Sequence, residues 1–260
     1  MRLKITYLFL FLLFITGCTT EDSGSNNGNG NNGINENLNR QTVGSSANDL
    51  LSATIFEKMI VEIVYVEGLE PTEETVTNFV SFLENRTHKP NGITIEKRAI
   101  PSPGNTSYSI QEIADIEIAE RQYYNTNNTI AVWALFIDGE SENNANGNIV
   151  LGSAYWNTSF VIFEETIQDY SNSTFEPNRT LLETIVITHE FGHIFGLTNL
   201  GTEMVTNHED TEHPKHCNNE DCLMFWATES SQGVDNMLNM TSAPELDSQC
   251  IADLQANGGK

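Results

Sequence analysis

One segment constrains the fold of this 260-residue chain more than any other: THEFGHIFG, residues 188–196. It places His189 and His193 four residues apart, with Glu190 beside the first histidine and Gly196 three residues after the second. Side chains four residues apart lie on the same face of an α-helix, so both imidazoles can reach one point. The segment therefore predicts a helix that presents two histidines together and ends at Gly196, since glycine adopts the left-handed conformation that terminates helices.

The same pattern extends upstream and predicts where this helix begins. Thr180 and Glu183 have the spacing of a capping box, which favours a helix start near residue 180. Leu182 and Val186 precede His189 at helical steps and continue the stripe on which the histidines lie. Apolar residues on the other sides of the helix are predicted to pack beneath a sheet; they are Ile187, Phe191, Ile194 and Phe195.

Two histidines at this helical spacing are typical ligands of a single metal ion. Zinc suits them because it accepts nitrogen ligands in distorted tetrahedral geometry and activates a bound water without redox chemistry. Glu190 lies next to His189, so its carboxylate can reach that water and act as a general base. We therefore predict a Zn²⁺ site in which His189 and His193 are ligands and Glu190 is catalytic.

A third zinc ligand is expected downstream, where the histidines of the chain are concentrated. The chain has six histidines, and only His88 lies outside residues 189–216. The candidates are His216, His213 and His208, with Asp210 as a carboxylate alternative, because zinc accepts imidazole or carboxylate ligands.

The segment HCNNEDCLM, residues 216–224, carries a second pattern. With the upstream motif it resembles the pattern HExxHxxGxxHCxxxxCxM of archaemetzincins, which belong to the metzincin clan of zinc proteases. The resemblance implies that His216 is the third ligand, and that Met224 forms the turn beneath the metal. The ligand position directly downstream of Gly196 holds Asn199, a poor zinc ligand. The resemblance therefore requires an insertion before His216, which a surface loop accommodates because closure cost grows slowly with length.

The cysteines depart from the archaemetzincin pattern. Archaemetzincins bind another, structural zinc with four cysteines, two of which form a downstream CxxC. Only Cys250 follows Cys222 in this chain, so the resemblance does not extend to that second zinc. In an exported protein we expect a disulfide between Cys217 and Cys222. Cys250 is then predicted to be a buried thiol in a C-terminal helix over residues 243–255.

The N-terminus is typical of an exported lipoprotein. Arg2 and Lys4 precede the apolar run ITYLFLFLLFIT and then Gly17-Cys18. This order predicts a signal peptide over residues 1–17. Its ITGC ending resembles a lipobox, which implies a lipid on Cys18. Residues 18–49 are rich in Gly, Asn and Ser and predict a flexible linker. We expect an outer-membrane lipoprotein that faces the periplasm or the cell surface.

The remainder, residues 50–260, is predicted to form one protease-like domain of the α+β class. Strands are expected at 58–69, 92–100 and 129–138, with two short strands within 148–165, and helices at 71–87 and 109–124. This order predicts a mixed twisted sheet with an antiparallel edge strand, an active-site helix and a C-terminal helix. Residues 152–158, GSAYWNT, resemble the metzincin edge strand that pairs with substrate, although a simple hairpin has the same pattern.

Charge narrows the possible partners. The formal net charge of −24 excludes binding to nucleic acid through a basic surface. We expect a monomeric zinc metalloprotease that acts on a peptide or protein substrate, with its lipid as the only membrane contact. Two alternatives stay open: a catalytically inactive binding or adhesin lipoprotein with the same fold, and an aminopeptidase.

Overall fold

The computed structural model describes residues 34–144, 149–173, 175–229, 233–234, 237 and 240–260. Residues Ile34–Lys260 form one compact unit. The predicted signal peptide, Cys18 and the linker up to residue 33 lie outside the described residues. Among those that are described, no helix has the length and apolar character needed to cross a bilayer.

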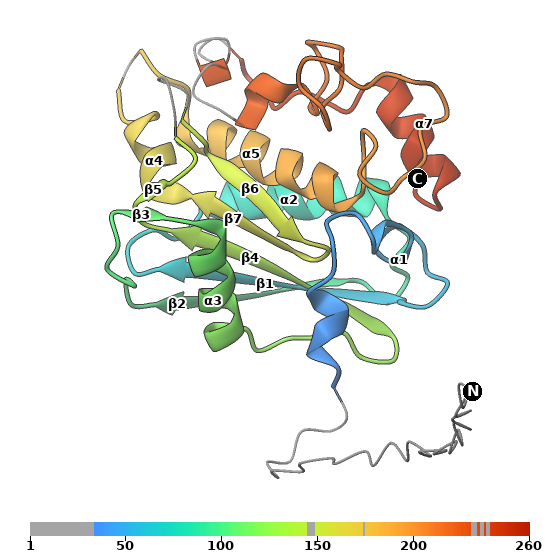
Figure 1. Cartoon of the computed structure of the whole chain (residues 1–260), viewed down its shortest axis with the longest axis horizontal. Coiled ribbons are helices and arrows are strands. Elements are labelled where there is room, and N and C mark those ends of the chain that lie inside the picture. The colour runs from blue at the N-terminus through green and yellow to red at the C-terminus, as the bar shows by residue number, and fades with distance from the viewer. Residues whose placement is uncertain (1–33, 145–148, 174, 230–232, 235–236, 238–239) are drawn as a thin grey trace, which may run out of the picture. The chain divides into compact units, whose positions relative to one another are not determined.

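A five-stranded mixed sheet forms the centre of this unit (Figure 1). Its order is β2-β1-β4-β7-β6; β6 pairs antiparallel with β7 at one edge, and the other neighbouring pairs are parallel. The predicted mixed sheet with an antiparallel edge strand is therefore confirmed. The strands are β1 (Lys58–Val66), β2 (Ile93–Ile100), β4 (Thr129–Ile137), β6 (Gly152–Trp156) and β7 (Ser159–Phe163).

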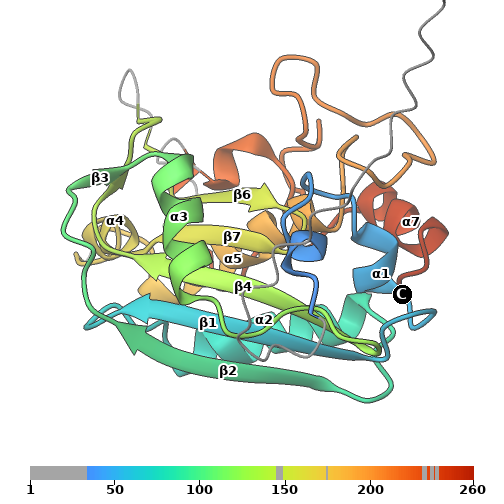
Figure 2. The ribbon, with the colours of Figure 1, turned by 60° about the horizontal axis from the view of Figure 1, so that its bottom comes forward.

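Helices cover both faces of the sheet. Helices α2 (Glu73–Arg86) and α5 (Arg179–Ile194) lie on one face, and α3 (Ile110–Glu120) lies on the other, as Figures 1 and 2 show from two directions. The predicted C-terminal helix is confirmed as α7 (Ser248–Ala256), which begins five residues later than the predicted start at residue 243. The shorter elements are η1 (Glu36–Asn39), α1 (Ala47–Leu51), β3 (Ser107–Tyr108), β5 (Glu140–Ser141), α4 (Glu164–Asp169) and η2 (Trp226–Glu229).

The domain begins earlier than the composition of residues 18–49 predicts. Asn39 is fully buried, and its amide donates to the side chain of Asn125 at 2.8 Å and to the carbonyl of Ala131 at 3.0 Å. The Asn157 amide likewise donates to the carbonyl of Leu38 at 2.8 Å. Residues 34–49 therefore belong to the fold, because their polar side chains complete hydrogen bonds within the domain that composition does not reveal.

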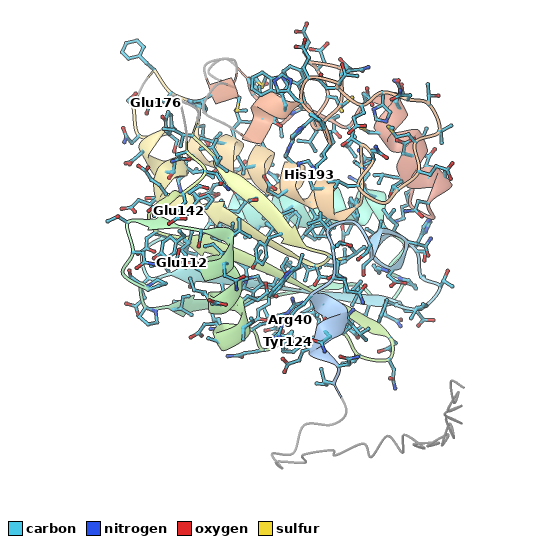
Figure 3. All side chains as sticks on the ribbon, viewed as in Figure 1. Arg40, Glu112, Tyr124, Glu142, Glu176 and His193 are labelled. Carbon is cyan, nitrogen blue, oxygen red and sulfur yellow. The ribbon has the colours of Figure 1, made fainter. Side chains whose placement is uncertain are left out.

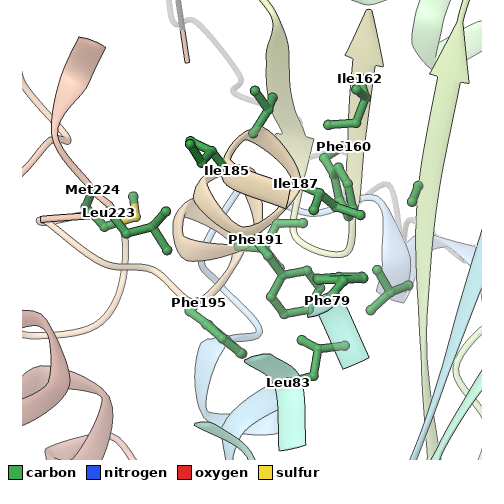
Figure 4. Close-up of a cluster of buried hydrophobic side chains, with 14 of the residues drawn as sticks. Phe79, Leu83, Phe160, Ile162, Ile185, Ile187, Phe191, Phe195, Leu223 and Met224 are labelled. Carbon is green, nitrogen blue, oxygen red and sulfur yellow. The ribbon is translucent and has the colours of Figure 1, made fainter. Parts of the chain in front are cut away.

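The main core lies between the sheet and the two helices on its α5 side. Figure 4 shows Phe191 of α5 beside Phe79 of α2, and their ring centroids are 5.3 Å apart in an edge-on arrangement. Phe160 of β7 packs on the same ring of Phe191, with 6.1 Å between the ring centroids. This packing fixes α5 against the sheet, so the opposite side of the helix can carry polar groups.

Candidate metal centre

The helix that carries the HExxH motif begins at Arg179, one residue before the predicted start. Its N-cap is Asn178, whose side chain accepts a backbone N–H of the first turn. Thr180 and Glu183 do not form a capping box. Glu183 instead accepts the backbone N–H of Thr72, the N-cap residue of α2, at 3.0 Å. The glutamate thus joins the starts of two neighbouring helices, a tertiary contact that the local pattern does not predict.

The end of α5 agrees with the prediction. Gly196 has φ of +73°, and its N–H donates to the carbonyl of His193 at 2.9 Å. The N–H of Leu197 donates to the carbonyl of Gly192 at 3.2 Å, which completes the hydrogen bonds of a Schellman motif. A side chain at Gly196 would also lie 2.7 Å from the backbone nitrogen of Thr202. The chain therefore leaves the helix at Gly196 and turns into the loop that follows.

Three imidazoles meet at this end of the helix. The rings of His189 and His193 are 4.8 Å apart, and that of His216 lies 5.4 Å from the first and 5.0 Å from the second, measured between centroids. One nitrogen from each ring lies within 4.8 Å of the other two. Figure 3 shows His193 on α5, below the loops that follow the helix. His189 and His193 are buried, and His216 is half-buried.

The contacts of two of these imidazoles suit a metal. His189 Nδ1 lies 2.7 Å from the carbonyl oxygen of Leu223, and His216 Nδ1 lies 3.2 Å from that of Pro214. A neutral imidazole that donates through Nδ1 carries its lone pair on Nε2, which is the arrangement of most metal-bound histidines. The three residues therefore fit a zinc ion chemically, since each offers an imidazole nitrogen within reach of one point.

The other candidate ligands lie elsewhere. His213 contacts Asp210 through Nδ1 at 2.9 Å, and its ring stacks on Trp226 at 4.1 Å between centroids. His208 is buried among cysteines. Asn199 is exposed and donates to Glu209 at 3.1 Å. Of the alternatives that the sequence leaves open, the structure brings only His216 to the pair on α5.

Local contacts hold the long loop before His216 in shape. Glu209 accepts the Asn199 amide at 3.1 Å through one carboxylate oxygen and the N–H of Lys215 at 2.8 Å through the other. The hydroxyl of Thr198 donates to the carbonyl of Lys215. The two ends of the loop are therefore held together, which returns the chain to α5 just where His216 follows.

Glu190 lies between the histidines and the edge strand β6. Its carboxylate accepts the backbone N–H of Ala154 at 2.7 Å and is fully buried. The strand comes this close because residue 152 is glycine; a Cβ there would lie 2.8 Å from both Cγ and Oε1 of Glu190. Sequence reasoning missed this contact, and the glycine inside a strand pattern was the one local signal of a close approach.

Met224 lies beneath the other side of α5. Figure 4 shows Met224 and Leu223 across the helix from Phe191 and Phe79. A side chain at Gly192, between the two histidines, would overlap the sulfur of Met224. The methionine is fully buried, so it supports the turn of helix that carries the histidines.

The cysteines differ from the prediction. Cys217 and Cys222 do not form the predicted disulfide, and both are buried free thiols, as is Cys250 in α7. The sulfur of Cys222 lies 3.7 Å from that of Cys250 and also interacts with the thiol of Cys217. His208 Nδ1 lies 3.4 Å from the sulfur of Cys217. The fold therefore gathers the three thiols at one place without joining Cys217 to Cys222, and the buried state predicted for Cys250 is confirmed.

A buried charge cluster lies at the other end of α5. Arg179 contacts Glu164 at 2.7 Å and Glu183 at 2.7 Å, so one guanidinium faces two buried carboxyl groups. Burial, and then the negative charge of Glu183, raises the pKa of Glu164 to about 8. Glu164 therefore holds a proton near neutral pH, since a single arginine cannot compensate two buried carboxylates.

The fold is similar to that of a solved archaemetzincin structure. No protein-family model and no curated protein sequence matches the chain. The crystal structure of an archaemetzincin from Methanopyrus kandleri superposes with a TM-score of 0.50 at 16% identity, over 77% of this chain and 96% of that one. The crystal structure of metalloproteinase-II from Bacteroides fragilis superposes with a TM-score of 0.39 at 14% identity, over 86% of this chain and 56% of that one. The second score is too low to establish a shared fold. The first shows that the domain has an archaemetzincin-like fold.

Proposed function

We propose that this domain is a zinc-dependent metallopeptidase. The observation that carries the proposal is the meeting of His189, His193 and His216 beside the buried carboxylate of Glu190. The archaemetzincin-like fold supports it, and in this chain the histidine-bearing helix α5 packs against the edge strand β6. When bound by the three imidazoles, zinc supplies a Lewis acid that activates water and polarises a peptide carbonyl.

The chain's own residues supply orientation and proton transfer. The carbonyls of Leu223 and Pro214 hold His189 and His216 with Nε2 as the ligand atom. Glu190 takes the proton of the attacking water on its carboxylate and delivers it to the amide nitrogen as the C–N bond breaks. The N–H of Ala154 holds one oxygen of that carboxylate in place at 2.7 Å.

The position of β6 suits an extended substrate. This strand is the last of the five-stranded sheet, and only one of its edges pairs with β7. A peptide that added to the other edge would gain backbone hydrogen bonds and pass beside Glu190. We therefore propose that the domain cleaves within extended peptide segments.

Replacing Glu190 with glutamine tests the proposed chemistry. The Glu190→Gln change keeps the size of the side chain, but an amide cannot accept the proton. The value of kcat should therefore fall about 10²- to 10⁴-fold while zinc content stays unchanged. The exposed Glu67→Gln variant is the matched control and should behave as the unmodified protein. Hydrolysis is measured on an unfolded protein and on short peptides, with the product sizes determined by mass spectrometry.

Each outcome of that experiment decides between functions. Unchanged hydrolysis in the Glu190→Gln variant overturns the role of Glu190. A zinc-loaded parent protein without hydrolysis favours a binding lipoprotein. Release of single terminal residues alone favours an aminopeptidase over cleavage within segments.

We further propose that a lipid on Cys18 anchors the domain at the outer face of a bacterial membrane. The signal-like residues 1–17 and the lipobox-like ITGC sequence support this placement. A Cys18→Ser variant should lose its acylated N-terminal peptide in mass spectra and leave the membrane fraction. Retention of the variant in that fraction contradicts the proposed anchor.

A further inference from the structure

A second group of metal-ligating side chains lies behind the loop that carries His216. Cys217 follows that histidine directly, Cys222 lies further along the same loop, and Cys250 comes from α7. His208 enters from the long loop that precedes them. All four side chains are buried, with at most 1% of their surface exposed.

We propose that Cys217, Cys222, Cys250 and His208 bind a second zinc ion. This site does not depend on the proposed peptidase activity. It also differs from the four-cysteine pattern to which the resemblance does not extend, because a histidine of the inserted loop takes the place of the missing cysteine. The inserted loop therefore supplies a ligand of its own, and it also moves the third ligand of the first site along the sequence to His216.

Two distances match a tetrahedral zinc site. The sulfurs of Cys222 and Cys250 are 3.7 Å apart, and His208 Nδ1 lies 3.4 Å from the sulfur of Cys217. Zinc bonds of about 2.3 Å to sulfur and 2.0–2.1 Å to nitrogen, at tetrahedral angles, place two sulfurs about 3.8 Å apart and a nitrogen about 3.6 Å from a sulfur. Thiols are weak hydrogen-bond donors and acceptors, so this convergence gains little without an ion.

The imidazole of His208 is oriented as a ligand. Its Nε2 lies 2.8 Å from a carboxylate oxygen of Asp253, which is itself buried. Donation from Nε2 to the carboxylate leaves the lone pair on Nδ1, the atom that faces Cys217. A carboxylate behind a histidine is the common outer arrangement of zinc sites. The other oxygen of Asp253 accepts the N–H of Val205 at 2.7 Å and so ties the loop to α7.

Asp247 competes with Cys222 for the fourth position on distance alone, because ligand atoms of His208, Cys217, Asp247 and Cys250 all lie within 4.8 Å of one another. One of its oxygens lies 3.5 Å from the sulfur of Cys217. That oxygen also accepts the amide of Asn219 at 3.2 Å, and the other oxygen accepts the N–H groups of Gln249 and Cys250. The carboxylate is therefore the N-cap of α7, and we assign it to orienting Cys250 rather than to the metal.

Backbone donors suit a thiolate at Cys222. The N–H groups of Met224 and Asp247 lie 3.5 Å and 3.4 Å from its sulfur. Such donors stabilise the charged sulfur that binds zinc, and ion binding displaces the thiol protons to solvent. With three thiolates and one imidazole, the ligand set is one that zinc commonly takes in structural sites.

This second ion would hold the third ligand of the first site. Cys217 adjoins His216, and its N–H donates to the carbonyl of Met224 at 2.7 Å. Ligation of Cys217 therefore fixes the backbone on which His216 is placed. The proposal predicts that loss of the second ion weakens zinc binding at the first site, and that the converse effect is smaller.

Metal content and cobalt spectra of the full chain test the ligand set. The parent protein should bind two zinc ions, and Co²⁺ substitution should produce sulfur-to-cobalt charge-transfer absorption. His208→Ala should lose that absorption and at least one ion. His216→Ala should lose one ion but keep the absorption, which separates this proposal from the peptidase proposal. His213→Ala and Asp247→Asn are the controls and should keep both ions and the absorption.

The result that overturns the proposal is a parent protein without cobalt–thiolate absorption. Loss of the absorption in Asp247→Asn but not in His208→Ala overturns the assigned ligand set. If the His208 variant does not fold, the parent protein supplies the measurement. Its three buried thiols should resist a thiol reagent until a chelator removes the ion, and rapid reaction of all three in the zinc-loaded protein contradicts the proposal.

Discussion

The most specific prediction from the structure concerns the Gly152→Ala substitution, which adds a methyl group between β6 and α5. The added Cβ would lie 2.7 Å from Cγ1 of Val186 and 2.8 Å from Cγ of Glu190. Non-bonded carbons prefer about 3.5–4.0 Å, so β6 and α5 must separate by about 1 Å. The bond from the Ala154 N–H to Glu190, now 2.7 Å, would then exceed hydrogen-bond range.

The expected loss of activity and stability follows from that displacement. Misplacing a catalytic group by about 1 Å costs on the order of 100-fold in rate, so kcat/KM should fall by that factor. Overpacking between strand and helix should also lower the free energy of unfolding by about 1–3 kcal/mol. The zinc ligands do not touch the new methyl group, so zinc content should not change.

Steady-state hydrolysis, zinc analysis and urea unfolding measure these effects. Ser153→Ala is the matched control, because adjacent residues of a strand point to opposite faces and this change adds no atom towards α5. The explanation fails if Gly152→Ala keeps the kcat/KM and the unfolding free energy of the parent protein. Loss of zinc would show instead that the whole site is displaced.

Two further perturbations test the buried polar groups. Glu164 has a pKa of about 8 in the folded protein, whereas the ordinary pKa of a glutamate is 4.5. The stability that the protonated group contributes should therefore be greatest below pH 4.5 and should decline as the pH rises to 8. Between about pH 5 and about pH 9, the free energy of unfolding measured in urea should fall by on the order of 3 kcal/mol in the parent protein, and Glu164→Gln should remove this decline. An equal dependence of the unfolding free energy on pH in both proteins contradicts this explanation. Asn39→Ala should cost about 1–3 kcal/mol because it leaves buried partners such as Asn125 unsatisfied, whereas the exposed Asn37→Ala should cost little. Equal thermal stability of the two asparagine variants would show that residues 34–49 do not contribute to the fold.

Features that depend on local periodicity follow from the amino-acid sequence alone. His189, Glu190 and His193 lie on one helix because residues four apart share a face, and Gly196 ends that helix because it accepts the left-handed conformation there without strain. The alternation of apolar residues also predicted the sheet, its edge strand and the helices that cover it. These features require only the geometry of a single element.

Features that depend on how loops return to the core emerge only in the folded chain. Several histidines follow Gly196, and only the folded loop, held by Glu209, shows that His216 reaches the pair on α5. The same folding brings Cys250 of α7 to Cys217 and Cys222. It also uses Glu183 to join α2 and α5 rather than to cap its own helix. The physical reason is that many loop conformations are compatible with one local pattern, and long-range packing selects among them.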